Sequence, residues 1–222
     1  MHVPGSLERG YQRFREGRYV RERALYETLA LGQSPRLAVL ACADSRVDPA
    51  MIFDAGPGEL FVLRNVANLV PDYETDGGFH GTSAGLEYAV RHLQVDDLVV
   101  MGHAACGGID ACIHHVTDGA AAGPFIDPWV GLADDAVRTV RTRAPELVGD
   151  ALQHEVELES IRASLDRLRA FPFVADAVAR RRLRLHGAWF SIASGAMLWL
   201  DDATGDFHAV TTRSLANGVS AA

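Results

Sequence analysis

Three short apolar runs, each about the length of one strand, constrain the fold of this chain more than any other feature. Residues 37–41, 60–63 and 98–101 are almost wholly apolar, as expected of strands that are covered on both faces. Between the second and third runs, residues 83–93 carry leucine and valine at helical spacing. A strand, a helix and a further strand in this order predict a parallel sheet with right-handed crossovers.

A long helix is predicted near the N-terminus, over residues 6–31. Ser6 is its expected N-cap, Gly17 a weak point and Gly32 its stop. Much of its surface is charged, and it either packs on its own domain or lies across a partner subunit. Further along, we predict helices over 107–116, 128–143 and 153–170, strands over 183–192 and 196–200, a turn at 201–206, and three arginines at a helix C-terminus at 180–182.

Sulfur and nitrogen ligands follow two of the predicted strands. Cys42 comes directly after the first run, in Cys-Ala-Asp-Ser-Arg, and His103 and Cys106 follow the third, in Gly-His-Ala-Ala-Cys-Gly-Gly. Because ligands gather at the carboxyl ends of parallel strands, we expect these side chains to meet at one edge of the sheet. Two thiols and one imidazole suit zinc, and three protein ligands leave a fourth position for water. The pattern therefore indicates a catalytic zinc site.

Composition limits the partners and the compartment. The chain has 222 residues, enough for one well-buried core, and we treat 1–222 as a single domain. Its net charge of -8 argues against a nucleic acid or an anionic membrane as partner. No apolar run approaches the roughly 20 residues of a membrane span, and the N-terminus lacks the apolar core of a signal peptide. With three cysteines, a disulfide framework is not expected, and we predict a cytoplasmic protein in which Cys112 is a buried apolar group.

Several stretches of the sequence resemble the beta class of carbonic anhydrases, and the resemblance covers nearly the whole chain. The matching stretches are Gly-Gln-Ser-Pro at 32–35, Cys-Ala-Asp-Ser-Arg-Val at 42–47, Phe-Val-Leu-Arg-Asn-Val-Ala-Asn at 61–68, Gly-His-Ala-Ala-Cys-Gly-Gly at 102–108 and Phe-Pro-Phe-Val at 171–174. Their order and spacing make the resemblance specific. It implies an α/β fold with a central sheet of four parallel strands, extended by an antiparallel strand near the C-terminus and flanked by helices.

The resemblance also implies an activity. It assigns one zinc ion per subunit to Cys42, His103 and Cys106, and it makes Asp44 and Arg46 a catalytic pair. The implied reaction is the reversible hydration of carbon dioxide to bicarbonate and a proton, through attack by zinc-bound hydroxide. Family members assemble from dimers with the site near a subunit interface, so we expect a homodimer or a dimer-based homo-oligomer.

Two opposite roles are open to Asp44. Held by the forked guanidinium of Arg46 through two parallel hydrogen bonds, it accepts a hydrogen bond from the zinc-bound hydroxide. Released by Arg46, it ligates zinc itself and makes the site inactive. Members that switch in this way resemble one another in carrying tryptophan three positions before the first cysteine, where this chain has Val39. We therefore predict an open site at neutral pH.

Five further residues are expected to bind the substrate. Gln33 matches the glutamine of the plant-like, constitutively open subtype, and its amide is a donor for a substrate oxygen. Phe61, Val66 and Phe79 fall where the family lines an apolar pocket, and the backbone N–H of Gly107 is a further donor. Each has a plainer alternative: an ordinary loop glutamine, core side chains, and a tight helix start.

Two other functions stay open. A hydrolase of carbonyl sulfide or carbon disulfide resembles this family and uses the same zinc chemistry. A non-catalytic zinc-binding or thiol-sensing protein would carry the same ligands, with Asp44 closing the zinc shell. Turnover of the gases, measured side by side, separates the first alternative, and an exchangeable water on zinc excludes the second.

Overall fold

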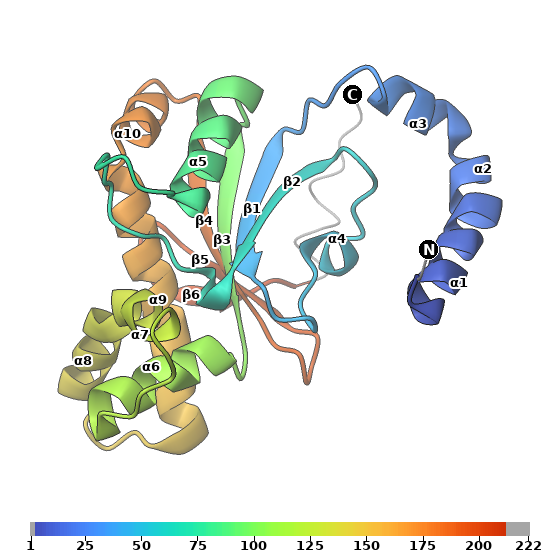
Figure 1. Ribbon diagram of the computed structural model, residues 1–222. Coiled ribbons are helices and arrows are strands. Elements are labelled where there is room, and N and C mark those ends of the chain that lie inside the picture. The colour runs from blue at the N-terminus through green and yellow to red at the C-terminus, as the bar shows by residue number, and fades with distance from the viewer. Residues whose placement is uncertain (1–2, 212–222) are drawn as a thin grey trace.

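A six-stranded sheet forms the centre of the computed structural model, which describes residues 3–211 (Figure 1). The strand order is β2-β1-β3-β4-β5-β6, in which the first four strands are parallel and the last two antiparallel. The strands are β1 (Leu37–Cys42), β2 (Leu60–Asn65), β3 (Asp97–His103), β4 (Arg184–Phe190), β5 (Met197–Leu200) and β6 (Phe207–Ala209). The predicted fold class is confirmed, and β6 is an addition to it. That strand is three residues long and mostly exposed, so it leaves no periodic pattern in the sequence.

The direction in which the chain leaves β1 determines where a site forms. From β1 the chain passes outward to β2, and it then returns to form β3 on the other side of β1. The strand order therefore reverses between β1 and β3, and a crevice at the carboxyl ends of parallel strands is expected at such a switch point. These two strands end in Cys42 and His103.

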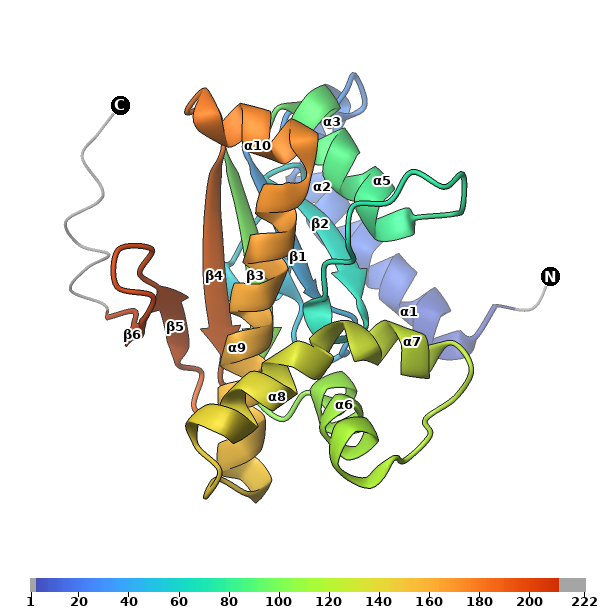
Figure 2. The ribbon, with the colours of Figure 1, turned by 90° about the vertical axis from the view of Figure 1, so that its left-hand side faces the viewer.

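Helices cover one face of the sheet and its carboxyl edge (Figures 1 and 2). On that face, buried side chains of β1 and β3 pack with the apolar stripe of α9, which includes Ile161, Leu165 and Leu168. Val39 and Met101 belong to a separate buried cluster on the opposite face, so both faces of the strands are covered. The helices after β1 are α4 (Pro49–Ile52), α5 (Gly81–Glu87, continued by a π-helical segment, Tyr88–Leu93), α6 (Gly107–Asp118), α7 (Ile126–Val130), α8 (Asp134–Arg143), α9 (Gly149–Ala170) and α10 (Pro172–Ala179).

The N-terminal helix is confirmed in extent but not in detail. It consists of α1 (Gly5–Arg13), a π-helical segment (Phe14–Arg18), α2 (Tyr19–Arg21) and α3 (Arg23–Leu29). The predicted cap at Ser6 is wrong, since the helix begins at Gly5 with Pro4 in the capping position and no side-chain capping bond. Gly17, the predicted weak point, lies in the π-helical segment, and the chain also departs from helical geometry at Glu22. This N-terminal arm has no buried residue and stands apart from the sheet (Figure 1).

A second correction concerns the helix predicted over 128–143. It is two helices, α7 and α8, separated by a 3₁₀ turn at Gly131–Ala133. Gly131 weakens the helix there, because glycine is unfavourable in a helix interior. The spacing of apolar residues alone does not reveal this interruption. The arginine run is placed as predicted, since Arg180 caps the C-terminus of α10. None of the helices in the described part of the chain is long and apolar enough to cross a membrane.

Gly187→Ala is expected to lower the free energy of unfolding by about 1–3 kcal/mol, the usual effect of overpacking a core. A Cβ at Gly187 would lie 2.9 Å from Cγ2 of Ile161 and 3.1 Å from Cβ of Leu200, so α9 or β5 must shift. Gly131→Ala is the matched control, because its Cβ meets nothing within 4 Å. We expect that variant to be neutral or slightly more stable. Urea denaturation checks both, and equal stability of the two variants would show that α9 does not lie against β4 as described.

Candidate metal centre

The structure brings together the three predicted ligands. One ligand atom each of Cys42, His103 and Cys106 lies within 4.8 Å of the other two. Cys42 ends β1, His103 ends β3, and Cys106 is the residue before α6. All three are buried, with 5%, 1% and 1% of their surface exposed. A buried group of two thiols and one imidazole is a strong candidate for a metal site.

A tight turn allows His103 and Cys106 to face the same point. Ala105, between them, has a φ of 53°, a left-handed conformation that is uncommon for a residue with a side chain. The backbone N–H of Ala104 donates to the carbonyl of Phe190 in β4, at 2.9 Å. The side-chain amide of Gln153 in α9 donates to the carbonyl of Cys106, at 3.1 Å. The turn is therefore anchored to both neighbouring elements.

The donor atoms fit a zinc ion. Nδ1 of His103 lies 2.9 Å from the carbonyl oxygen of Ala104, to which it donates, so Nε2 carries the lone pair. Nε2 is buried and has no hydrogen-bond partner among the described residues. The Sγ atoms of Cys42 and Cys106 are 3.9 Å apart. Two Zn–S bonds of ~2.3 Å in a tetrahedral site would hold the sulfurs ~3.8 Å apart.

The two thiols respond to each other electrostatically. The hydrogen bond with Cys106 lowers the pKa of Cys42 well below its usual range, despite its burial. The same contact, together with burial, raises the pKa of Cys106. Without a cation the pair therefore keeps one shared proton, because two adjacent thiolates repel each other. A divalent cation stabilises the second thiolate and releases that proton.

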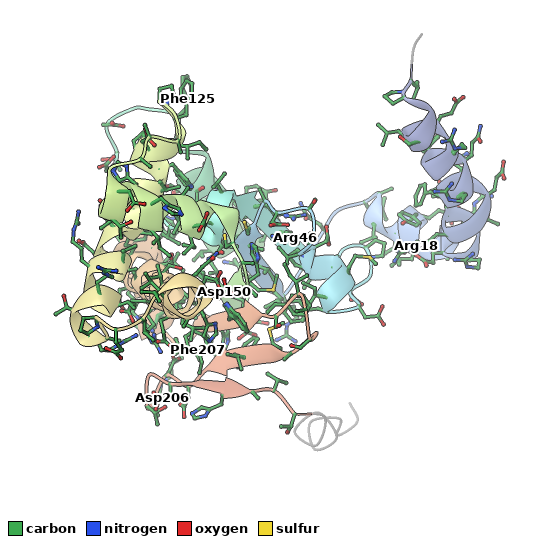
Figure 3. The ribbon with its side chains drawn as sticks, turned by 90° about the horizontal axis from the view of Figure 1, so that it is seen from below. Arg18, Arg46, Phe125, Asp150, Asp206 and Phe207 are labelled. Atoms are coloured by element: carbon green, nitrogen blue, oxygen red, sulfur yellow. The ribbon has the colours of Figure 1, made fainter. Side chains whose placement is uncertain are left out.

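Asp44 and Arg46 form an ion pair beside the thiols. Nε of Arg46 donates to Oδ1 of Asp44 at 2.9 Å, and Nη2 donates to Oδ2 at 2.6 Å. Nη2 also donates to the carbonyl of Ala105 at 3.1 Å, so Arg46 connects the two ligand-bearing segments. The hydrogen bond from Arg46 holds the pKa of Asp44 well below its usual range. An ionised carboxylate oxygen thus lies 3.9 Å from Nε2 of His103. Figure 3, seen from the end at which the parallel strands finish, shows Arg46 at this edge.

Arg64 has a role at the site that the sequence analysis did not assign. It lies in β2, and its guanidinium donates to the carbonyls of Cys42 at 2.9 Å, Asp44 at 2.5 Å and Val47 at 3.3 Å. Three bonds from one side chain hold the segment that carries both Cys42 and Asp44. An arginine near the carboxyl end of the strand next to β1 was the available signal.

Glu157 is the second functional residue that the sequence analysis missed. Its carboxylate accepts a hydrogen bond from the backbone N–H of Cys106 at 3.0 Å and one from the indole N–H of Trp189 at 2.9 Å. Only 2% of its surface is exposed, and this burial raises the pKa of the carboxyl group. The signal was an acidic residue one turn before Ile161, at the spacing of the core stripe of α9.

Glu157→Gln is expected to weaken zinc binding by about 10- to 100-fold, as is usual when a group supporting a metal ligand is removed. The amide keeps one acceptor oxygen but turns its NH₂ group toward a donor, which also lowers the free energy of unfolding by about 1–3 kcal/mol. Glu155→Gln is the control, since that residue is on the surface of the same helix and pairs with Arg143. Competition with a zinc-binding dye measures the affinity; equal values for the two variants would remove Glu157 from the site.

The predicted substrate-binding residues do not all lie at the metal edge of one chain. Val66 follows the end of β2 and packs against the start of α6, where Gly107 follows Cys106, so both lie at the metal edge. Gln33 is exposed and precedes β1, and Phe61 is the second residue of β2. Since six residues of strand span ~20 Å, Gln33 lies at the opposite edge of the sheet from Cys42. Phe79 is fully exposed in the segment before α5.

Cys112 is buried and outside the metal cluster, as predicted. It lies in α6, and burial raises the pKa of its thiol to about 12. A protonated buried thiol behaves as a small apolar group, so this residue serves packing.

Comparisons with known proteins identify the family of this chain. A family model described as carbonic anhydrase matches residues 37–197. The chain is 36% identical over 186 residues to a protein of Arabidopsis thaliana named beta carbonic anhydrase 5, chloroplastic. That match covers 84% of this chain, and the chain spans 61% of the relative's length.

Solved structures show the same similarity. The beta-carbonic anhydrase CcaA has a TM-score of 0.87 and 32% identity, over 94% of this chain and 92% of that chain. One of the tetrameric beta-carbonic anhydrases of Sordaria macrospora has a TM-score of 0.79 and 27% identity, over 88% of this chain and 95% of that chain. Since the family model matches 37–197 and CcaA is matched along nearly its whole length, this chain belongs to the carbonic anhydrase family, in its beta class.

Proposed function

We propose that this chain catalyses the zinc-dependent, reversible hydration of carbon dioxide to bicarbonate and a proton, with one zinc ion per subunit. The observation that carries the proposal is the buried Cys42, His103 and Cys106 group with an ionised Asp44 beside it. The named relatives, which are beta carbonic anhydrases, support it. When bound, a zinc ion would supply a Lewis acid that makes water acidic enough to yield hydroxide near neutral pH.

Asp44 orients the nucleophile in this proposal. Because Arg46 keeps the carboxylate ionised, Asp44 can only accept hydrogen bonds. It would therefore favour hydroxide, whose O–H can donate, over neutral molecules that have no hydrogen to donate. A lone pair of that oxygen then faces the substrate carbon. Attack by that hydroxide would form one C–O bond as a C=O electron pair of carbon dioxide moves to its oxygen, and the proton lost by water would go to buffer. The two thiolates would cancel the formal charge of the metal, and the charge of Arg46 balances that of Asp44 beside them.

The site stays open at neutral pH in our proposal, as in the plant-like subtype. The supporting observation is the engagement of both Asp44 oxygens by Arg46, which opposes direct ligation of the metal by Asp44. We also propose that the chain acts in the cytoplasm. Its three cysteines, all buried and unpaired, fit a reducing compartment.

A homodimer, or a larger assembly built from dimers, is the proposed state. The N-terminal arm exposes Leu7, Tyr11 and Val20 by 66%, 61% and 61%. An exposed apolar surface of this kind marks an interaction site, and a second copy of the chain is the occupant that family membership supports. The related structure from Sordaria macrospora is described as tetrameric.

Gln33 reaches carbon dioxide only from a second subunit, because its own metal centre lies at the other edge of the sheet. We expect Gln33→Ala to lower kcat/KM by about tenfold through loss of one hydrogen bond to the substrate, while zinc is retained. Co-expression with Asp44→Asn tests whether Gln33 acts on the site of the other subunit or on that of its own. Each mixed dimer would regain one complete site if Gln33 acts across the interface, and activity would rise above that of either variant. No gain on mixing would contradict action of Gln33 across the subunit interface. Phe61 and Phe79 remain predicted pocket residues.

A stopped-flow hydration assay tests the proposed activity. We expect rapid hydration of carbon dioxide by the zinc-loaded protein, loss after treatment with a chelator, and recovery when zinc is added. Carbonyl sulfide is measured in parallel. Much faster turnover of carbonyl sulfide would replace the proposal with the hydrolase alternative. Absence of any hydration by the zinc-loaded protein would favour a non-catalytic zinc protein.

A further inference from the structure

A depression lies at the edge of the sheet opposite the metal centre. Leu37 of β1, Asp97 of β3 and Arg184 of β4 are aligned in the sheet, so the segments that enter these three strands meet there. The depression has a volume of about 450 Å³ and lies beside the C-terminus of α10, which Figures 1 and 2 show at the end of the molecule away from α6. We call it the arginine depression, since its polar lining comes from Arg36, Gln94, Asp96, Arg181, Arg182 and Arg184.

Positive charge is concentrated in this depression although the whole chain carries -8. Four arginines line it against one aspartate, Asp96, which pairs with Arg36. Arg184 pairs with Asp97 at 2.6 Å, and Arg182 approaches Asp176 only at 3.5 Å. That aspartate is also engaged by Arg180, at 2.8 Å.

Arg181 has no such partner. No carboxylate of the described residues lies within 4.0 Å of its guanidinium. Arg181 and Arg182 follow the C-terminus of α10, an end of a helix that favours cations, whereas Arg36 and Arg184 come from the entries to β1 and β4. Arg36 and Arg184 are each paired with an aspartate, so the positive charge that the ion pairs leave unbalanced is that of Arg181 and of the weakly paired Arg182.

Two of the lining residues occupy positions that favour glycine. Gln94 follows the segment Tyr88–Leu93 with a φ of 54°, and Arg181 follows α10 with a φ of 56°. A residue just past a helix end in this left-handed conformation is usually glycine, because other side chains are strained there. At both positions the chain instead places a long polar side chain that lines the depression. Gln94 and Arg181 thus each adopt an unfavourable backbone conformation at a position from which the side chain lines the same depression.

We propose that the arginine depression binds a small anion that carries phosphate groups. Forked guanidinium groups donate parallel hydrogen bonds to phosphate oxygens, and several of them around one depression recognise more than one such group. The volume lies in the range of small-molecule pockets, about 300–1,000 Å³. A nucleic acid is disfavoured by the overall negative charge of the chain.

Isothermal titration of the full-length, zinc-loaded protein with inorganic pyrophosphate tests the proposal. We expect saturable binding at low salt. Binding should weaken as the sodium chloride concentration is raised, because salt ions screen the attraction between the arginines and pyrophosphate. Arg181→Gln combined with Arg182→Gln should weaken binding by about tenfold or more. Arg36→Gln, on another segment, should also weaken it. Arg141→Gln, an exposed arginine of α8 at the far end of the molecule, is the control and should bind as the wild type does.

Four outcomes would overturn the proposal. They are absence of binding, binding undiminished by the arginine changes, equal loss in Arg141→Gln, and tighter binding of a single-stranded oligonucleotide through the same arginines. Undiminished binding would place the anion at the metal centre instead. In the absence of pyrophosphate, carbon dioxide hydration should be unchanged in all the arginine variants. A failure of pyrophosphate binding can therefore be distinguished from a failure of the proposed carbonic anhydrase activity.

Discussion

Cys106→Ser is expected to lose zinc and carbon dioxide hydration together. The hydroxyl of serine stays protonated at neutral pH and is a poor zinc ligand, so only Cys42 and His103 would remain. Removing one of three protein ligands should weaken zinc binding by about a thousandfold or more. Metal analysis of the purified protein and the stopped-flow assay measure the two losses.

Cys112→Ser is the matched control for that variant. It makes the same chemical change at a buried cysteine outside the metal cluster. We expect it to cost about 1–3 kcal/mol of stability, because it buries a hydroxyl group, and to retain zinc and activity. If Cys106→Ser kept its zinc, or if the two variants lost it equally, the ligand assignment would be wrong.

Asp44→Asn is expected to retain zinc while hydration falls by about 10²–10⁴-fold, the range for loss of a positioned proton acceptor. The amide has nearly the same shape, but it lacks the charge and places a donor where both oxygens now accept from Arg46. The activity assay and metal analysis are made on the same preparation. Full activity in this variant would remove Asp44 from the mechanism.

Asp48→Asn is the control for Asp44. Asp48 is a nearby aspartate whose carboxylate caps α4 and pairs with Arg64. Asparagine caps a helix about as well as aspartate, so the replacement should cost less than about 1 kcal/mol of stability, through the ion pair, with little effect on hydration. The pH profile offers a further check: because Arg46 lowers the pKa of Asp44, the carboxylate loses its charge only below the usual range of an aspartate. A fall in activity between pH 7 and 5 must therefore come from another group.

The convergence of the metal ligands could be predicted from sequence because it depends on topology. Parallel strands buried on both faces are continuous apolar runs, and the residues after β1 and β3 must meet at one edge. Asp44 and Arg46 were predicted as a pair from the resemblance to the family, and their closeness in the sequence makes the ion pair local. These inferences needed no knowledge of distant side-chain contacts.

The supporting residues could not be predicted in the same way. Arg64 and Glu157 act through contacts with backbone groups of the distant residues Cys42 and Cys106, and their own sequence surroundings do not show this. The strand β6 and the break at Gly131–Ala133 are short local features that hydrophobic spacing does not register. The location of Gln33 is a different case, since in the proposed function it acts from a second subunit, and one chain does not contain that surface.

X-ray absorption at the zinc edge, recorded on the purified protein, tests the central claim most directly. Coordination by Cys42, His103, Cys106 and one water predicts two sulfur atoms at about 2.3 Å and two nitrogen or oxygen atoms at about 2.0–2.1 Å. A shell with three sulfurs, with one or none, or a protein that takes up no zinc at all, would contradict the account.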